Sequence, residues 1–181
     1  MKNFRVKQIV AAAIGAALFF VLGRFVSVPS PVPNTSICLQ YGVLAFIAAV
    51  FGPVVGLFAG LIGHFLTDLS WGDPWWSWII ASALFGLVLG FVKNILKVEE
   101  GGLTKKNIIL FNVFQAAAHL VAWVVVAPVL DIVMYSEPAN KVFVQGLVAA
   151  GANIVTTAII GTLLLIAYSA SIPKKGSLKE E

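Results

Sequence analysis

Long apolar runs, almost free of charged residues, constrain this chain more than any other feature of its sequence. A helix needs about 20 apolar residues to cross the hydrocarbon core of a bilayer. Charged residues make up 11% of the 181 residues, whereas soluble domains carry roughly 25%. We therefore predict an all-α membrane protein, a single integral membrane domain with six transmembrane helices at residues 8–28, 37–51, 54–69, 75–92, 107–127 and 144–168.

The basic residues predict how these helices are oriented. Lys and Arg gather in the short loops on the cytoplasmic side of a membrane. With the N-terminus inside, ten of the twelve basic residues fall in inner segments, and only Arg24 and Lys141 lie towards the outside. Both termini are then cytoplasmic, and residues 171–181 form a polar cytoplasmic tail. The net charge of +4 is read as a topology signal, and nucleic acid is not expected as a partner.

Residues 63–78 concentrate the polar and aromatic chemistry, with four of the five tryptophans, a histidine and two acids. We predict a short loop at 70–74 between two membrane helices, with His64 and Asp68 on one face of the preceding helix. The following helix begins with an aromatic cluster of Trp75, Trp76 and Trp78. A water-facing pocket for a small, flat solute is one interpretation. An ordinary aromatic belt at the bilayer interface is the other.

Other polar residues lie at a similar predicted depth in the outer half of the membrane. An ionisable side chain at mid-bilayer costs at least about 2.5–3.5 kcal/mol, so such residues are functional candidates. Structural alternatives stay open, because His64 and Asp68 can satisfy each other and interhelical hydrogen bonds can explain Gln115 and His119. One cavity open to the outside would collect the further substrate-binding candidates Asn34, Gln40, Gln115, His119, Trp123 and Asn153.

Catalytic and metal-binding patterns are weak. A metal site built from His64, Asp68 and His119 is chemically allowed, but no Cys partner or close His pair supports it, and we predict no metal. The sequence holds no nucleophile elbow, zinc-protease motif or phosphate-binding loop. We therefore predict that the chain is not an enzyme and does not hydrolyse ATP by itself.

Two segments between the predicted helices differ in character. Residues 28–34 carry three prolines and no charge, which favours a semi-rigid extended segment that is either a lid or a plain connector. Residues 128–141 hold enough polar side chains to be predicted as a solvated outer loop.

Small residues recur at intervals of four in three predicted helices, a spacing that lets helix backbones approach closely. Packing within the chain is enough to explain the third and fourth helices, with Gly52, Gly56 and Gly60 in one and Ser82, Gly86 and Gly90 in the other. The first helix presents a flat patch suited to another protein, made by Ala12, Ala13, Ala16 and Ala17.

Short motifs along nearly the whole chain resemble one known family. They are Ile14-Gly-Ala-Ala-Leu-Phe-Phe, Pro33-Asn-Thr, Leu39-Gln-Tyr, Phe51-Gly-Pro, Gly63-His and Pro74-Trp-Trp-Ser-Trp. With six helices and the alanine motif, the chain resembles the S component, the substrate-binding membrane subunit, of an energy-coupling factor (ECF) type ABC transporter. The likeness is to a branch near the riboflavin-type S components.

The resemblance implies a subunit of the bacterial cell membrane that binds a water-soluble vitamin or vitamin precursor near the extracellular face. A small heteroaromatic of the pyrimidine, pyridoxine or flavin type is the best guess. The resemblance also implies that the alanine face docks on a transmembrane coupling (T) subunit driven by two ATPase subunits. ATP would be used by those partners, and this chain would bind no cofactor. The loops after the first and third helices would close over the solute.

Two other functions stay open at this point. A stand-alone small channel or secondary transporter would use the first helix to form a homo-oligomer. An intramembrane enzyme would be built on His64 and Asp68. Binding without turnover favours an S component, ion-coupled flux through the purified protein favours the channel or secondary transporter, and chemical change of a ligand favours the enzyme.

Overall fold

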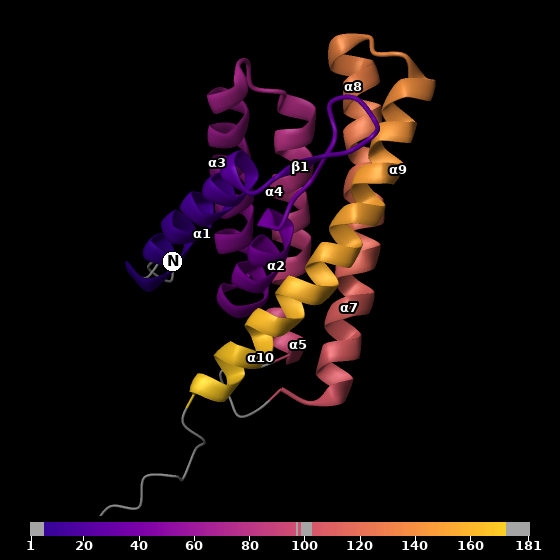
Figure 1. The fold of residues 1–181 in the computed structure, drawn as a ribbon. Coiled ribbons are helices and arrows are strands. Elements are labelled where there is room, and N and C mark those ends of the chain that lie inside the picture. The colour runs from indigo at the N-terminus through magenta and orange to yellow at the C-terminus, as the bar shows by residue number, and fades with distance from the viewer. Residues whose placement is uncertain (1–5, 97, 99–102, 173–181) are drawn as a thin grey trace, which may run out of the picture.

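The structure is a computed structural model that describes residues 6–96, 98 and 103–172. Nearly all of these residues lie in the helices of one bundle, from which α1 leans away (Figure 1). The first half of the chain forms α1 (Val6–Phe25), β1 (Val28–Pro29), β2 (Ser36–Ile37), α2 (Gln40–Phe51), α3 (Pro53–Trp71), α4 (Trp76–Gly90) and α5 (Lys93–Leu96). The second half forms α7 (Lys105–Leu120), η1 (Val121–Val126), α8 (Ala127–Tyr135), α9 (Ala139–Thr156), η2 (Thr157–Gly161) and α10 (Thr162–Ser171).

Five helices in the described part of the chain are long and apolar enough to cross a membrane. Two of them are continuous rods, one of 31 residues from α7 through η1 to α8 and one of 33 residues from α9 through η2 to α10. The predicted helical membrane architecture is therefore confirmed. The helix α2 has 12 residues and is about 18 Å long, short of a hydrocarbon core of about 30 Å. Six complete spans thus stay a prediction.

The end of the α7–η1–α8 rod differs from the sequence prediction. Residues 128–141 were expected to form a solvated loop, but α8 continues to Tyr135 and α9 begins at Ala139. The helix accommodates Pro128 because this residue lies in the first turn of α8, directly after the π-helical segment η1. A π-helical turn changes the hydrogen-bond register, and a proline has no N–H to donate. The predicted loop is therefore wrong over most of its length.

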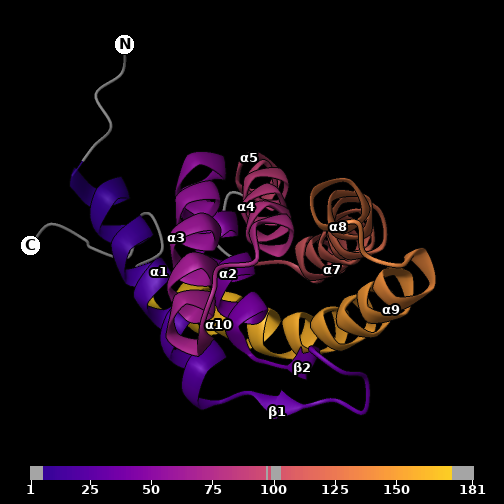
Figure 2. The same cartoon turned by 90° about the horizontal axis from the view of Figure 1, so that it is seen from above.

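The proline-rich segment after α1 forms a short hairpin, as its predicted extended conformation suggested. Val28 pairs with Ile37 and Pro29 with Ser36 in an antiparallel arrangement. The tip of the hairpin is held to α9 by Gln145, whose Nε2 donates to the carbonyl oxygen of Pro33 at 2.9 Å. Seen from above, β1 and β2 run alongside α9 (Figure 2). The predicted tail at 171–181 lies outside the described residues except for its start.

The small residues of α3 and α4 bring the two backbones into contact. A Cβ atom added to Gly86 would lie 2.2 Å from the carbonyl oxygen of Gly56, and one added to Gly60 would lie 2.5 Å from that of Ser82. A Cβ atom on Gly90 would lie 2.3 Å from the Cα of Pro53. The predicted packing of these two stripes within the chain is confirmed, because the backbones of α3 and α4 touch.

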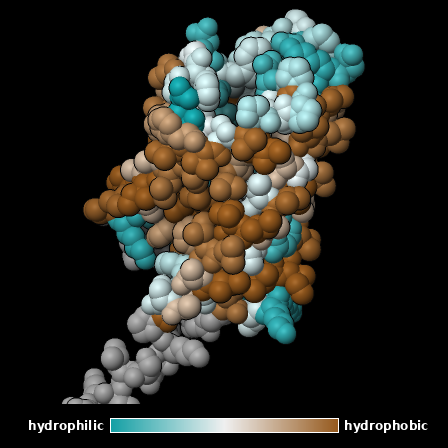
Figure 3. Space-filling view, in the orientation of Figure 1, coloured by the Kyte–Doolittle hydropathy of each residue, from teal (hydrophilic) through white to brown (hydrophobic). Residues whose placement is uncertain are grey.

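The surface is divided into an apolar belt and a polar end. Figure 3 shows hydrophobic side chains across the middle of the molecule and hydrophilic ones gathered at its upper end. That end holds the hairpin and the α3–α4 and α8–α9 connections, whereas the start of α1 and the end of α10 lie away from it (Figure 1). An apolar belt of this kind is the surface that a bilayer would cover.

Candidate functional site

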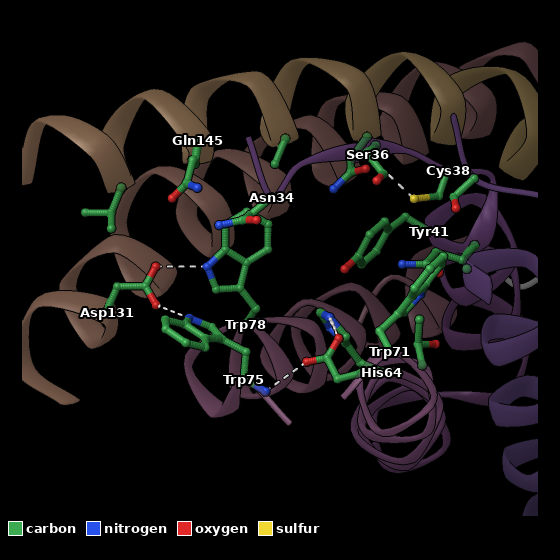
Figure 4. Close-up of a pocket in the computed structure, with 18 of the residues that line it drawn as sticks. Asn34, Ser36, Cys38, Tyr41, His64, Trp71, Trp75, Trp78, Asp131 and Gln145 are labelled. Atoms are coloured by element: carbon green, nitrogen blue, oxygen red, sulfur yellow. Dashed lines mark hydrogen bonds and ion pairs between the residues drawn. The ribbon is translucent and has the colours of Figure 1, made fainter. Parts of the chain in front are cut away.

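A cavity of about 540 Å³ opens at this polar end, between α2, α3, the start of α4, α8, α9 and the hairpin (Figure 4). Its volume lies in the range of pockets for small molecules, roughly 300–1,000 Å³. Seven of the predicted substrate-binding residues are brought together on its wall: Asn34, Gln40, His64, Asp68, Trp75, Trp78 and Asn153. They come from five separate elements, which the sequence separates by up to 119 positions.

Asp131 anchors the aromatic part of the wall. Its carboxylate accepts hydrogen bonds from Nε1 of Trp75 at 2.6 Å, from Nε1 of Trp78 at 2.9 Å and from the hydroxyl of Ser77. The residue is 2% exposed. Three donors on two oxygens suit an ionised carboxylate, which can only accept. The indole N–H groups are therefore already bonded to protein, and the indoles offer the cavity their ring surfaces.

A second polar chain crosses the cavity floor from α2 to α3. The Tyr41 hydroxyl lies 2.9 Å from Oγ of Ser82, which lies 2.6 Å from Nδ1 of His64. Nε2 of the same imidazole lies 3.4 Å from Oδ1 of Asp68. Donors can run from Tyr41 through Ser82 to Nδ1 of His64, which leaves the proton on Nε2, the nitrogen that faces Asp68.

Asp68 also organises the loop that follows α3. Its Oδ2 accepts from the backbone N–H of Trp75 at 3.0 Å, and its carbonyl oxygen accepts from the N–H of Gly72 at 2.9 Å. Gly72 has a φ of 151°, a conformation that side chains with a Cβ rarely adopt. His64 and Asp68 thus contact each other and line the cavity at once.

Acidic and basic residues are strongly segregated. Every acidic residue in the described part of the chain lines the cavity: Asp68, Asp73, Asp131 and Glu137. Of the six Lys and Arg residues in that part, only Lys141 lines it. Nζ of Lys141 lies 2.7 Å from a carboxylate oxygen of Glu137, so these two charges offset each other.

One buried amide on the cavity wall has an unused acceptor. Gln40 is 5% exposed, and its Oε1 has no hydrogen-bond partner among the described residues. The atom occupies the space beside Gly23, where an added Cβ would lie 1.9 Å away. A buried polar atom without a partner costs free energy. A ligand that donates a hydrogen bond would satisfy it.

Four predicted substrate-binding residues lie away from the cavity wall. Trp76 packs on Phe65 at a ring distance of 5.6 Å. The others lie deeper, on the α7–η1 rod: Gln115, His119 and Trp123. The rod continues eight residues beyond the end predicted at residue 127, so these side chains lie about 12 Å deeper than the prediction placed them.

The deep residues bond to one another and to neighbouring helices. Nδ1 of His119 accepts from Nε1 of Trp123 at 3.1 Å, so Nε2 carries the proton and donates to Oγ1 of Thr157 at 3.0 Å. The imidazole also stacks on Phe85 with ring centres 4.0 Å apart. Nε2 of Gln115 donates to the carbonyl oxygen of Ile154 at 3.3 Å. These contacts match the alternative in which such residues hold helices together.

Several residues of the wall were not among the predicted set. Asp131 was assigned to a solvated loop, although an acid beside a long apolar run was a usable signal. Gln145, on α9, carries no sequence signal of this kind. Tyr41 stands out only as part of a family motif, Trp71 only as one of five tryptophans, and Cys38 carries no distinguishing pattern. In the described residues, no group of three or more His, Cys, Asp or Glu side chains is arranged to hold a metal ion.

The alanine patch of α1 is split between two faces. Ala12 and Ala16 are 8% and 3% exposed and belong to the inside of the bundle. Ala13 and Ala17 are exposed. The four residues cannot form one outward face, because positions four apart share a side of a helix and neighbouring positions do not.

Comparisons with known proteins agree with this architecture. The profile of the family described as "ECF-type riboflavin transporter, S component" matches residues 3–170. A UPF0397 protein of Exiguobacterium sp. (strain ATCC BAA-1283 / AT1b) is 55% identical over 182 residues, which cover 100% of both chains. A UPF0397 protein of Streptococcus gordonii is 55% identical over 99% of this chain and 96% of its own length.

Among solved structures, the crystal structure of the S-component for biotin from an ECF-type ABC transporter is similar to this chain. The TM-score is 0.65 and the sequence identity is 17%, with 91% of this chain and 92% of that chain covered. At this identity the likeness concerns the fold.

Proposed function

Since the chain belongs to the family of ECF-type riboflavin transporter S components, we propose that it is the substrate-specificity subunit of an ECF-type ABC importer. It binds a water-soluble vitamin or vitamin precursor at the polar end of the bundle and delivers it inward together with an ATP-driven module. The observation that carries this proposal is the cavity of about 540 Å³, which brings seven predicted candidates from five elements to one wall.

The wall favours a flat heteroaromatic solute. Two indoles, those of Trp75 and Trp78, are fixed beside the cavity by Asp131. Tyr41 packs edge-on against Trp123 and Phe19, with ring centres 5.2 Å apart in both pairs. Rigid aromatic surfaces bind flat rings by offset stacking or edge-to-face contact. A pyrimidine, pyridoxine or flavin type of ring suits this wall.

The proposed orientation places the cavity on the extracellular side of the bacterial cell membrane and both termini in the cytoplasm. Four of the described basic residues support it, because they lie at the opposite end of the bundle from the cavity: Lys7, Lys93, Lys105 and Lys106. Basic residues on one side of a membrane protein favour the cytoplasm. The hairpin and the α3–α4 loop then border the outer entrance.

The proposed partners are a transmembrane coupling (T) subunit and two ATPase subunits, which use the ATP. This chain would be a transport subunit without its own ATPase. The exposed side of α1 supports a protein contact, because Ala13 and Ala17 form a small-residue notch between the exposed apolar residues Ile14 and Leu18. Small residues let helices approach closely in lipid. The contact therefore uses Ala13 and Ala17 and not the buried pair Ala12 and Ala16.

Uptake measurements test the proposal. The chain is purified from its own host, and the small molecules it retains are identified by mass spectrometry. Uptake of the identified molecule is then measured in cells with and without the coupling module. We expect uptake only with the module, and binding without flux for the chain alone. Flux through vesicles that contain the chain alone would instead identify a channel or secondary transporter.

A further inference from the structure

The charges around the cavity are unbalanced. Its wall holds the four acids Asp68, Asp73, Asp131 and Glu137 and the single cation Lys141. Arg24 is a further cation beside this wall, and its guanidinium lies over the ring of the wall residue Trp71 with the central carbon 3.8 Å from the ring centre. Four carboxylates therefore face two cations, and one of these is paired with Glu137. Asp68 and Asp131 accept hydrogen bonds, but no Lys or Arg among the described residues pairs with either carboxylate.

Several donors of the wall are already used within the protein. Nε1 of Trp75 and Trp78 bonds to Asp131, the Thr67 hydroxyl donates to the carbonyl oxygen of Gly63, and the Gln145 amide donates to Pro33. Oε1 of Gln40 is buried beside Gly23 without a partner in the described part of the chain, and the two oxygens of Asp68 have unused lone pairs.

The aromatic part of the wall matches these acceptors. The face of an aromatic ring carries partial negative charge and attracts cations within about 6 Å of its centre. Trp71 already holds the Arg24 guanidinium in this way. Trp75 and Trp78 (Figure 4) line the same cavity as Asp68. Carboxylates, a free amide oxygen and indole faces form a surface that complements a positively charged donor.

We propose that the solute of this cavity is a cation, a flat nitrogen heterocycle that carries a protonated amino group or a quaternary ring nitrogen. This inference rests on the proposed function, because it specifies the charge of the solute that the same site would import. The positive group lies beside Asp68, an N–H donor bonds to Oε1 of Gln40, and the ring packs against the indoles. Neutral rings lose the charge complementarity, and anionic rings face an excess of carboxylates.

Three probes with one ring and different charges test the proposal. They are 1-methylnicotinamide, a fixed cation, nicotinamide, which is neutral, and nicotinate, an anion. Binding to the full chain in lipid nanodiscs is followed by tryptophan fluorescence and by thermal shift at pH 7. We expect the cation to bind at least about tenfold more tightly than the neutral ring, and the anion most weakly. Equal or tighter binding of the neutral or anionic probe overturns the proposal.

Two variants that change the net charge of the wall in opposite directions provide the matched control. Asp68→Asn removes one negative charge at nearly constant shape, and we expect about tenfold or greater loss of affinity for the cationic probe with a much smaller change for the neutral one. Lys141→Gln leaves Glu137 uncompensated, and we expect tighter binding of the cation. Equal weakening of all three probes by Asp68→Asn overturns the proposal. If that variant does not fold, Asp73→Asn at the exposed rim replaces it.

If none of the three probes binds, the charge of the native solute tests the proposal. Its formal charge at pH 7 is read from the molecule released by the chain purified from its own host. A cation supports the proposal, and a neutral or anionic solute overturns it while leaving the proposed function intact. A chain that retains no solute and supports no uptake with a coupling module contradicts the proposed function itself.

Discussion

Trp75 and Asp131 are 56 positions apart in the chain, yet Nε1 of the indole lies 2.6 Å from a carboxylate oxygen. This contact joins the residue that precedes α4 to the middle of α8. Trp75 also stacks on Tyr135 of α8, with ring centres 4.2 Å apart. The aromatic wall of the cavity therefore depends on a carboxylate supplied by the other half of the molecule.

Replacing Asp131 should free the indoles of Trp75 and Trp78 from their hydrogen-bond acceptor. Asp131→Ala leaves two indole N–H groups and the Ser77 hydroxyl without their acceptor, and each unpaired buried group costs about 1–3 kcal/mol. We expect a lower melting temperature, a shifted tryptophan emission maximum and at least about tenfold weaker solute binding, since the indoles lose their anchor. Asp131→Asn keeps one acceptor oxygen and should have an intermediate effect. Unchanged emission and affinity in Asp131→Ala would show that packing alone holds the indoles.

Contact between the backbones of α3 and α4 makes Gly86 intolerant of any side chain. Its added Cβ would lie 2.2 Å from the carbonyl oxygen of Gly56, so Gly86→Ala must separate the helices. Overpacking of this kind costs about 1–3 kcal/mol or more. Gly151→Ala on α9 is the matched control, because no atom lies within 4 Å of the added Cβ. Thermal unfolding in detergent should show a marked loss for Gly86→Ala only, and similar curves for both would contradict the close contact.

The two sides of α1 should respond differently to larger side chains. Ala17→Leu lies on the exposed side and should leave folding and solute affinity intact while it blocks assembly with the coupling subunit. Ala16→Leu lies inside the bundle at 3% exposure and should lower the melting temperature, by an overpacking cost of about 1–3 kcal/mol. Co-purification with the coupling module and thermal unfolding measure the two effects. Normal assembly and uptake by Ala17→Leu would exclude this face as the contact.

Cys38 should report on occupancy of the cavity. Burial raises the pKa of this thiol to about 11 from an ordinary value of 9.0. The neutral thiol therefore predominates at pH 7, and only the thiolate reacts with alkylating agents. We expect slow labelling by N-ethylmaleimide at pH 7, a rise of about tenfold per pH unit up to about pH 11, and protection by bound solute. Fast labelling at pH 7 that solute does not change would contradict a buried position on the wall.

The sequence predicted the helices better than it predicted their ends. The apolar runs located the helices because lipid requires long uncharged segments. The end of the α7–η1–α8 rod was misplaced, since Pro128 normally marks a helix boundary and the π-helical turn before it was not recognisable. The position of the hairpin against α9 depends on the long-range contact of Gln145 with Pro33, which no local pattern encodes.

The same boundary error explains which of the predicted site residues reach the cavity wall. His64, Asp68 and Trp75 lie within a few positions of a short loop, so their depth depended little on counting, and all three reach the cavity wall. His119 was counted from a helix end that lies eight residues too early, and it is enclosed by Trp123, Thr157 and Phe85. The same early helix end places Asp131 in a predicted loop, whereas the structure places it in α8 at the cavity wall.

The shortness of α2 has a consequence for translocation. This helix begins with Gln40 at the cavity wall and ends at Phe51, a length of about 18 Å. In a hydrocarbon core of about 30 Å, roughly 12 Å are left for the cavity and the hairpin above it. In the proposed orientation, a solute beside Gln40 would lie about two fifths of the way through the hydrocarbon core. The path left for a coupling module to open would be about the length of α2.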